Sequence, residues 1–149
     1  MLKSREEYVM AKQRIEDDRR IAERQRETLQ AAGVTGEELN RMLEPLLTFH
    51  AQLEEEVEWF DRIASGDFSS VSDLEAIGRL IIALRLAQDV SQEELAVRLE
   101  VSVEQVIRDE RDEYYGFTKE EINAVLAALG VRIQTTVVPT HGAAISFAC

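Results

Sequence analysis

The sequence predicts an all-α protein in which an antiparallel helical hairpin of the coiled-coil type precedes a compact bundle of short helices, with a short β strand or hairpin at the C-terminus. Three patterns lead to this prediction. Apolar residues recur at helical spacing through the first part, 1–66. Short segments that each follow a Ser or Thr fill a second part, 72–130, and apolar and polar residues alternate in the tail, 131–149.

The composition is that of a folded, helix-rich chain. Of 149 residues, 45% are apolar and 31% are charged, with 7 Gly and 2 Pro. Uncharged apolar stretches such as Leu80–Leu84 are far shorter than the roughly 20 residues that a membrane span needs. The charged start lacks the apolar core of a secretion signal, so we expect a cytoplasmic protein. Cys149 is the single cysteine and His50 and His141 are the two histidines, so we expect no metal and no cofactor.

The first helix is predicted over residues 4–32, which contain neither Pro nor Gly. Its apolar positions repeat every seven residues, at Tyr8, Ile15, Ala22 and Leu29. Asp18 and Gln25 interrupt this seam, and we expect them to be exposed or to set the register.

The second helix begins after the break at Gly33–Gly36, where Thr35 and Glu38 have the spacing of a capping box. Pro45 cannot donate a backbone hydrogen bond, so a kink or a restart is expected there. We expect His50 to be a tolerated, partly buried residue and not a pH switch. The seam alternates by four and three through Leu39, Leu43, Leu46, His50, Leu53, Val57, Phe60 and Ala64.

Two helices alone bury little apolar surface, so the hairpin is predicted to dimerise with that of a second subunit. The alternative is a hairpin that packs only on its own C-terminal domain. The residues expected at the dimer contact are Leu39, Leu43, Leu46, Leu53, Val57 and Phe60.

The second part should hold four helices. One begins near Ser72 or Asp73, after the polar linker, and three shorter ones are expected over Ser91–Leu99, Ser102–Asp112 and Thr118–Leu129. After Gly130, an alternation through Val131, Ile133, Thr135 and Val137 predicts a strand, with 143–148 as its return partner or with pairing across a dimer.

Ile77–Gly130 resembles the Cro-like (xenobiotic-response-element, XRE) class of helix-turn-helix repressors. The hallmark Ser-Gln-Glu-Glu-Leu-Ala stands at Ser91–Ala96, followed by Leu99, by Val101 and Ser102, and by Glu110 and Arg111. The continuation Tyr115–Thr118 and Ala127–Gly130 is similar to antitoxin-type members. The resemblance implies a lambda-repressor-like bundle whose helix from Ser102 enters the major groove, while the helix start at Gln92 lies against a phosphate.

The resemblance and side-chain chemistry together suggest contacts to DNA. Gln105 can pair with adenine, Glu104 can accept from cytosine and Val103 can touch a thymine methyl group. Arg108 can reach guanine or phosphate, and Arg79, Arg85 and Arg98 are candidate flanking phosphate contacts. Alternatively, Gln92 and Gln105 are only solvated, and Arg108 and Arg111 pair with Glu104, Asp109 or Glu110 along the helix. The expected interface comprises Ser91, Gln92, Ser102, Val103, Glu104, Gln105, Arg108 and Arg111.

The predicted function is a homodimeric, sequence-specific regulator of transcription, most simply a repressor that binds a double-stranded DNA operator. An antitoxin that holds a basic toxin protein is a more specific version. The alternative is a degenerate helix-turn-helix that serves as a protein-interaction or assembly module without binding DNA. The net charge of -12 and Glu100, which stands in the turn where the family usually has Gly, favour that alternative. No phosphate-binding Gly loop or activated cysteine is present, so no enzymatic activity is expected.

Overall fold

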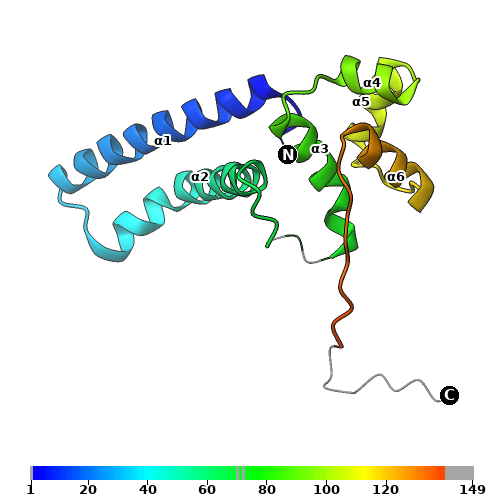
Figure 1. Cartoon of the computed structure of the whole chain (residues 1–149). Coiled ribbons are helices and arrows are strands. Elements are labelled where there is room, and N and C mark those ends of the chain that lie inside the picture. Colours follow the sequence, from blue (N-terminus) through cyan, green and yellow to red (C-terminus); the bar gives the residue numbers. More distant parts are fainter. Residues whose placement is uncertain (1, 70, 72, 140–149) are drawn as a thin grey trace.

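The computed structural model describes residues 2–69, 71 and 73–139. A long antiparallel hairpin extends to one side of a bundle of four short helices (Figure 1). None of the helices in the described ranges is both long and apolar enough to cross a membrane. The elements are α1 (Arg5–Ala31), α2 (Gly36–Ala64), a 3-10 turn (Leu74–Ala76), α3 (Ile77–Ala87), α4 (Gln92–Leu99), α5 (Val103–Arg111) and α6 (Lys119–Ala128).

The hairpin forms with two local differences from the sequence-based expectation. Thr35 precedes α2 in the extended conformation of a helix N-cap, but its side chain makes no capping hydrogen bond, so the predicted capping box is wrong. The restart expected at Pro45 is also wrong, since α2 runs unbroken from Gly36 to Ala64. Pro45 is exposed, so water can reach the backbone carbonyl that its missing N–H leaves without a helical partner.

The seam of α2 closes against the same chain. Leu43 is only 1% exposed, and Leu39, Val57 and Phe60 are also buried, while Leu46 and Leu53 are half-buried. Four of the six residues expected at a dimer contact therefore have their side chains covered within one protomer. His50 is half-buried, with its Nε2 3.1 Å from Oε1 of Glu54.

The base of the hairpin and the short helices share one hydrophobic core. Phe60 and Ile63 of α2 belong to the same buried cluster as Ile81 of α3, Leu95 of α4 and Val106 of α5. A smaller cluster joins the start of the chain to the hairpin through Leu2, Ala11, Ile15 and Val57. The hairpin is thus packed on its own C-terminal part at its base and extends away from it at its tip (Figure 1).

The expected C-terminal strand is wrong for the described residues 131–139, which form an extended segment without a strand. Val131 and Ile133 pack on the helical core, and Val137 and Val138 are exposed. Packing on the helices therefore accounts only for the first two apolar positions of the alternation, and no other described segment lies beside 131–139 as a strand to accept its backbone hydrogen bonds. The proposed return partner, 143–148, lies outside the described residues.

Candidate nucleic-acid interface

Two short helices, α4 and α5, are joined through the tight turn Glu100–Ser102. The hydroxyl of Ser91 accepts the backbone N–H of Glu94 at 3.0 Å, and that of Ser102 accepts the N–H of Gln105 at 3.2 Å, so both serines cap a helix as expected. Glu100 ends α4 in the left-handed region, at φ 58° and ψ 37°. Glu100 therefore adopts a left-handed backbone conformation that favours glycine.

The angle between the two helices is set by apolar packing beneath them. Leu95 and Ala96 of α4 and Val106 of α5 are buried in the shared core. The small side chain of Ala96 lets α5 cross close above α4, which is the requirement of a helix pair joined by so short a turn.

The two sides of α5 differ sharply in exposure. Val106 and Glu110 face inward and are buried, whereas the outward positions follow helical spacing of three and four. Val103 and Gln105 are half-buried, so the predicted contact residues do not all lie on the outer side. The exposed residues of α5 form an outer stripe, which consists of Glu104, Ile107, Arg108 and Arg111.

Polar side chains on α5 are engaged along the helix itself. The Gln105 amide donates to Oδ1 of Asp109 at 2.7 Å, and its Oε1 accepts from Nη2 of Arg108 at 2.6 Å. Nε of Arg111 lies 3.2 Å from Oδ1 of Asp112. Binding a base edge would require Gln105 and Arg108 to exchange these exposed or half-buried contacts, which are weak in water.

Beneath α5 lies a buried ion pair. Arg85 of α3 is 3% exposed and Glu110 is 0% exposed. The guanidinium donates from Nε to Oε1 at 2.5 Å and from Nη2 to Oε2 at 2.7 Å. Its Nη1 also donates to the carbonyl of Val90 at 2.8 Å. The suggestion that Arg85 contacts phosphate is therefore wrong, because its donors are used inside the protein.

The start of α4 is occupied by groups of this chain. Nε2 of Gln92, which is half-buried, donates to Oε2 of Glu110 at 2.7 Å, so this side chain braces the buried pair. The pKa of Glu93 is lowered by hydrogen bonds from its own backbone N–H and from Ser91. Its carboxylate thus already stands at the positive end of α4, where the sequence suggested a phosphate.

The two other candidate phosphate contacts lie apart from α5. Arg98 bridges α4 and α6, since its Nη1 donates to the carbonyl of Ala128 at 3.0 Å and its Nη2 to Glu94 at 2.6 Å. Arg79 stacks on Trp59, with Cζ 4.8 Å from the ring centroid.

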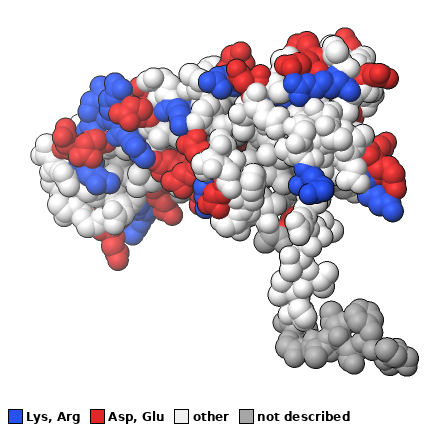
Figure 2. Space-filling view, viewed as in Figure 1, with Lys and Arg blue, Asp and Glu red and all other residues white. Residues whose placement is uncertain are grey.

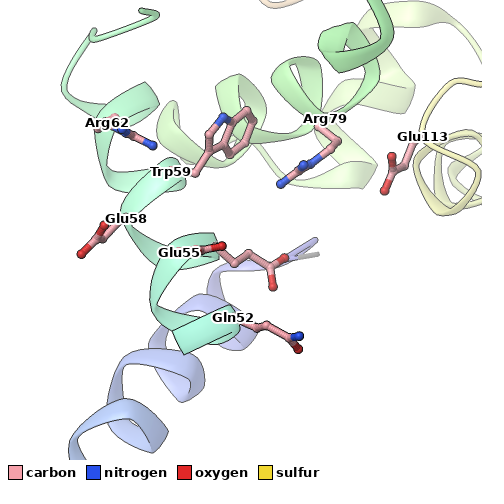
Figure 3. A pocket seen from close by; sticks show the side chains of 8 residues that line it. Gln52, Glu55, Glu58, Trp59, Arg62, Arg79 and Glu113 are labelled. Carbon is pink, nitrogen blue, oxygen red and sulfur yellow. The ribbon is translucent and has the colours of Figure 1, made fainter. Parts of the chain in front are cut away.

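Arg79 and Trp59 line a pocket of about 780 Å³ at the junction of the hairpin and the bundle (Figure 3). Figure 3 shows the two side chains extending toward each other from α2 and α3, with Glu113 beyond Arg79. Arg79 therefore binds the hairpin to the bundle and does not stand beside α5. The lining comprises Gln52, Glu55, Glu56, Glu58, Trp59, Arg62, Arg79 and Glu113.

The surface over α4 and α5 carries both signs of charge. In Figure 2, basic and acidic atoms lie side by side at the end of the molecule that holds these helices. A phosphate backbone would thus meet a mixed surface and not a uniformly basic one. In the described ranges, no group of three or more His, Cys, Asp or Glu side chains is placed to hold a metal ion.

Sequence reasoning missed two features of this region. Ile107 is 45% exposed at the middle of the outer stripe, and its spacing from Glu104 and Arg111 could have revealed this. Glu110 follows Val106 by four residues, which places it on the inner side and implies a buried cationic partner. That the partner is Arg85 depends on the three-dimensional packing of α3.

Comparison with known proteins adds no assignment: no family model, no curated protein and no solved structure matches this chain.

Proposed function

We propose that this chain is a sequence-specific DNA-binding regulator of transcription that inserts α5 into the major groove. The observation that carries the proposal is the outer stripe of α5, where an apolar side chain, two arginines and a glutamate stand opposite a firmly buried side. Arginine is suited to guanine, an exposed apolar side chain to the thymine methyl group and glutamate to the cytosine amino group. A short helix fixed from below can present these groups as a rigid set.

The proposal includes a homodimer on a palindromic operator, with half-sites about one helical turn apart. Because most of the α2 seam is covered within one chain, the contact between subunits would use other apolar side chains of the hairpin. Met10, Met42 and Phe49 are at least half exposed and available for this. The same proposal places the protein in the cytoplasm, and an antitoxin role would add a basic toxin as a partner of the acidic surface.

The test is a fluorescence-polarisation titration against DNA from the promoter of the protein's own gene. Replacing Arg108 with Ala should weaken binding about 5- to 100-fold, the range expected for one good base contact. The matched control is Lys119→Ala on α6, whose side chain is 84% exposed and pairs only with its neighbour Glu120 in the described part of the chain. Equal affinities of the Arg108 variant and the wild type would remove α5 as the reading helix.

A second candidate function is a protein-interaction or assembly module. The two acidic residues in the first turn of α4, Glu93 and Glu94, favour it, since negative charge at this helix start repels the phosphate expected there. A chain that shows no salt-dependent DNA binding at about 50 mM salt, a condition under which even a few phosphate contacts register, would support this candidate over the first.

A further inference from the structure

The chain segment before α1 packs against the end of α5. Leu2 is buried in the smaller apolar cluster, and Nζ of Lys3 donates to the backbone carbonyl of Arg111 at 2.9 Å. Arg111 is the last residue of α5 and is separated from Lys3 by more than a hundred positions in the sequence. Two remote parts of the chain thus meet at one helix end.

The contact has a favourable chemistry. The last carbonyls of a helix lack helical partners, and they carry the negative end of the helix dipole. An ammonium group placed there satisfies an acceptor and neutralises part of that dipole. Lys3 therefore stabilises the final turn of α5 specifically.

A second link runs through the buried ion pair. Nη2 of Arg85 donates to the carbonyl of Lys3 at 2.8 Å and also to Oε2 of Glu110 on α5 at 2.7 Å. The same nitrogen therefore joins the N-terminal segment to the inner side of α5. Any shift of residues 2–4 would disturb α5 both at its end and from below.

The segment is itself held in place by the base of the hairpin. The Tyr8 hydroxyl bonds to Asp61 of α2, and Nζ of Lys12 lies 3.2 Å from Oδ2 of the same carboxylate. The Tyr8 ring also packs on Phe60, with ring centroids 4.6 Å apart. Because Phe60 is part of the main core, the start of α1 is anchored to the bundle.

We propose that the N-terminal segment Leu2–Ser4 is a positioning element for α5, through which the hairpin determines how the outer stripe of α5 is presented to DNA. Its structural part is measurable without DNA. Its effect on binding rests on the proposed function.

The first test measures backbone amide hydrogen exchange in Lys3→Met and in the matched control Lys119→Met. Both variants replace a lysine, but Lys3 reaches the end of α5, whereas Lys119 is exposed on α6 and pairs only with Glu120 in the described part of the chain. Exchange in the last turn of α5 should rise about two- to fivefold in Lys3→Met, the size expected for one cation at a helix terminus. Amides near the tip of the hairpin, at the start of α2, open without breaking the Lys3 contact and should keep equal rates in both variants. Unchanged α5 exchange in Lys3→Met overturns the proposal, whatever the protein does with DNA.

The second test is the salt dependence of DNA binding. A positioning role predicts an affinity about two- to fivefold weaker for Lys3→Met with an unchanged slope of log K against log salt, and no change for Lys119→Met. A slope that falls by about one would show instead that Lys3 contacts a phosphate, which also overturns the proposal. If the wild type binds no DNA, the proposed function fails, while the exchange experiment still decides the structural inference.

Discussion

At the scale of single residues, the turn between α4 and α5 contains backbone strain that a single substitution can relieve. Glu100 has φ 58° and ψ 37°, a conformation that costs a residue with a Cβ about 1 kcal/mol or more. Glu100→Gly should therefore raise the free energy of unfolding, by about 0.5–1 kcal/mol after the greater freedom of glycine in the unfolded chain is subtracted. Denaturant titration measures the change.

The control for Glu100→Gly makes the same substitution inside a helix. Glu23 is exposed in the middle of α1, and Glu23→Gly should lower the stability by about 1 kcal/mol. If both variants are destabilised alike, the left-handed backbone at Glu100 is not a source of strain.

Tyr114 presents the opposite case, a buried polar atom without compensation. The ring is buried and stacks edge-on against Phe117, but its hydroxyl has no hydrogen-bond partner among the described residues. Burial, followed by the nearby Glu110 carboxylate, raises the pKa of the Tyr114 hydroxyl well above its ordinary value of 10.0. Folding thus strongly disfavours the tyrosinate.

Tyr114→Phe is expected to keep or increase stability at neutral pH, because no hydrogen bond is lost and a desolvated hydroxyl is removed. The direction in which stability changes with pH follows from the raised pKa of Tyr114. Above pH 10.0, the unfolded chain loses the Tyr114 proton while the folded chain keeps it, so the contribution of this group to stability falls as pH rises. Unfolding curves from about pH 8 to about pH 11, which span the ordinary pKa of tyrosine, should show a smaller alkaline loss for Tyr114→Phe than for the wild type. An identical loss in both proteins contradicts the prediction.

At the scale of elements, α3 and the turn after α5 approach each other as closely as backbones allow. A Cβ built on Gly78 would lie 1.8 Å from the carbonyl oxygen of Glu113. Glu113 and Tyr114 both have positive φ, at 53° and 56°, so this turn has little freedom to move away.

Gly78→Ala should therefore cost about 3 kcal/mol or more, since the clash is with backbone and not with a flexible side chain. Gly36→Ala serves as the control. Gly36 has φ 62°, but nothing lies within 4 Å of the place that a Cβ would take, so only the backbone strain of about 1 kcal/mol remains. Thermal unfolding should rank the Gly78 variant well below the Gly36 variant, and the reverse order would show that α3 can slide away from the turn.

The elements that could be predicted from the sequence are those marked by local signals. Ser91, Ser102 and Thr118 each precede a short helix, and all three make the side-chain capping bond that their residue type favours. The strand prediction for the tail was wrong because an alternation of period two is typical of any extended segment that packs one side on a core. Exposure on α5 follows from its helical period, but the hydrogen bond of Gln105 to Asp109 was not predicted.

At the scale of the whole molecule, the apolar pattern of α2 correctly indicated which side of the helix is buried. It did not indicate which surface of the protein covers that side. Leu39 and Leu43 are covered within the chain, and Phe60 enters a core shared with four other helices. A seam of period 3.5 states only that one side of a helix is apolar. The hairpin prediction already placed α1 against this side, whereas its coverage by α3 is decided by long-range packing that no local pattern encodes.

The long-range packing converges on the Arg85 guanidinium, which joins the N-terminal segment, the turn before α4, and α5 to α3. Removing one charge of a buried pair leaves the other without compensation. Arg85→Met and Glu110→Leu should therefore each cost about 3–5 kcal/mol. The double variant should cost less than either single one, about 1–2 kcal/mol, because no buried charge is then left unpaired; the carbonyls of Val90 and Lys3 lose a donor and the Gln92 amide loses an acceptor.

An exposed ion pair provides the contrast. Arg20 and Glu16 lie on α1 with side chains more than half exposed, and Arg20→Met should change stability by less than about 0.5 kcal/mol. Urea titrations of the wild type, the two single variants and the double variant give the coupling energy directly. Single effects that simply add in the double variant would mean that Arg85 and Glu110 act independently, and that the ion pair does not hold the N-terminal segment, α3 and α5 together.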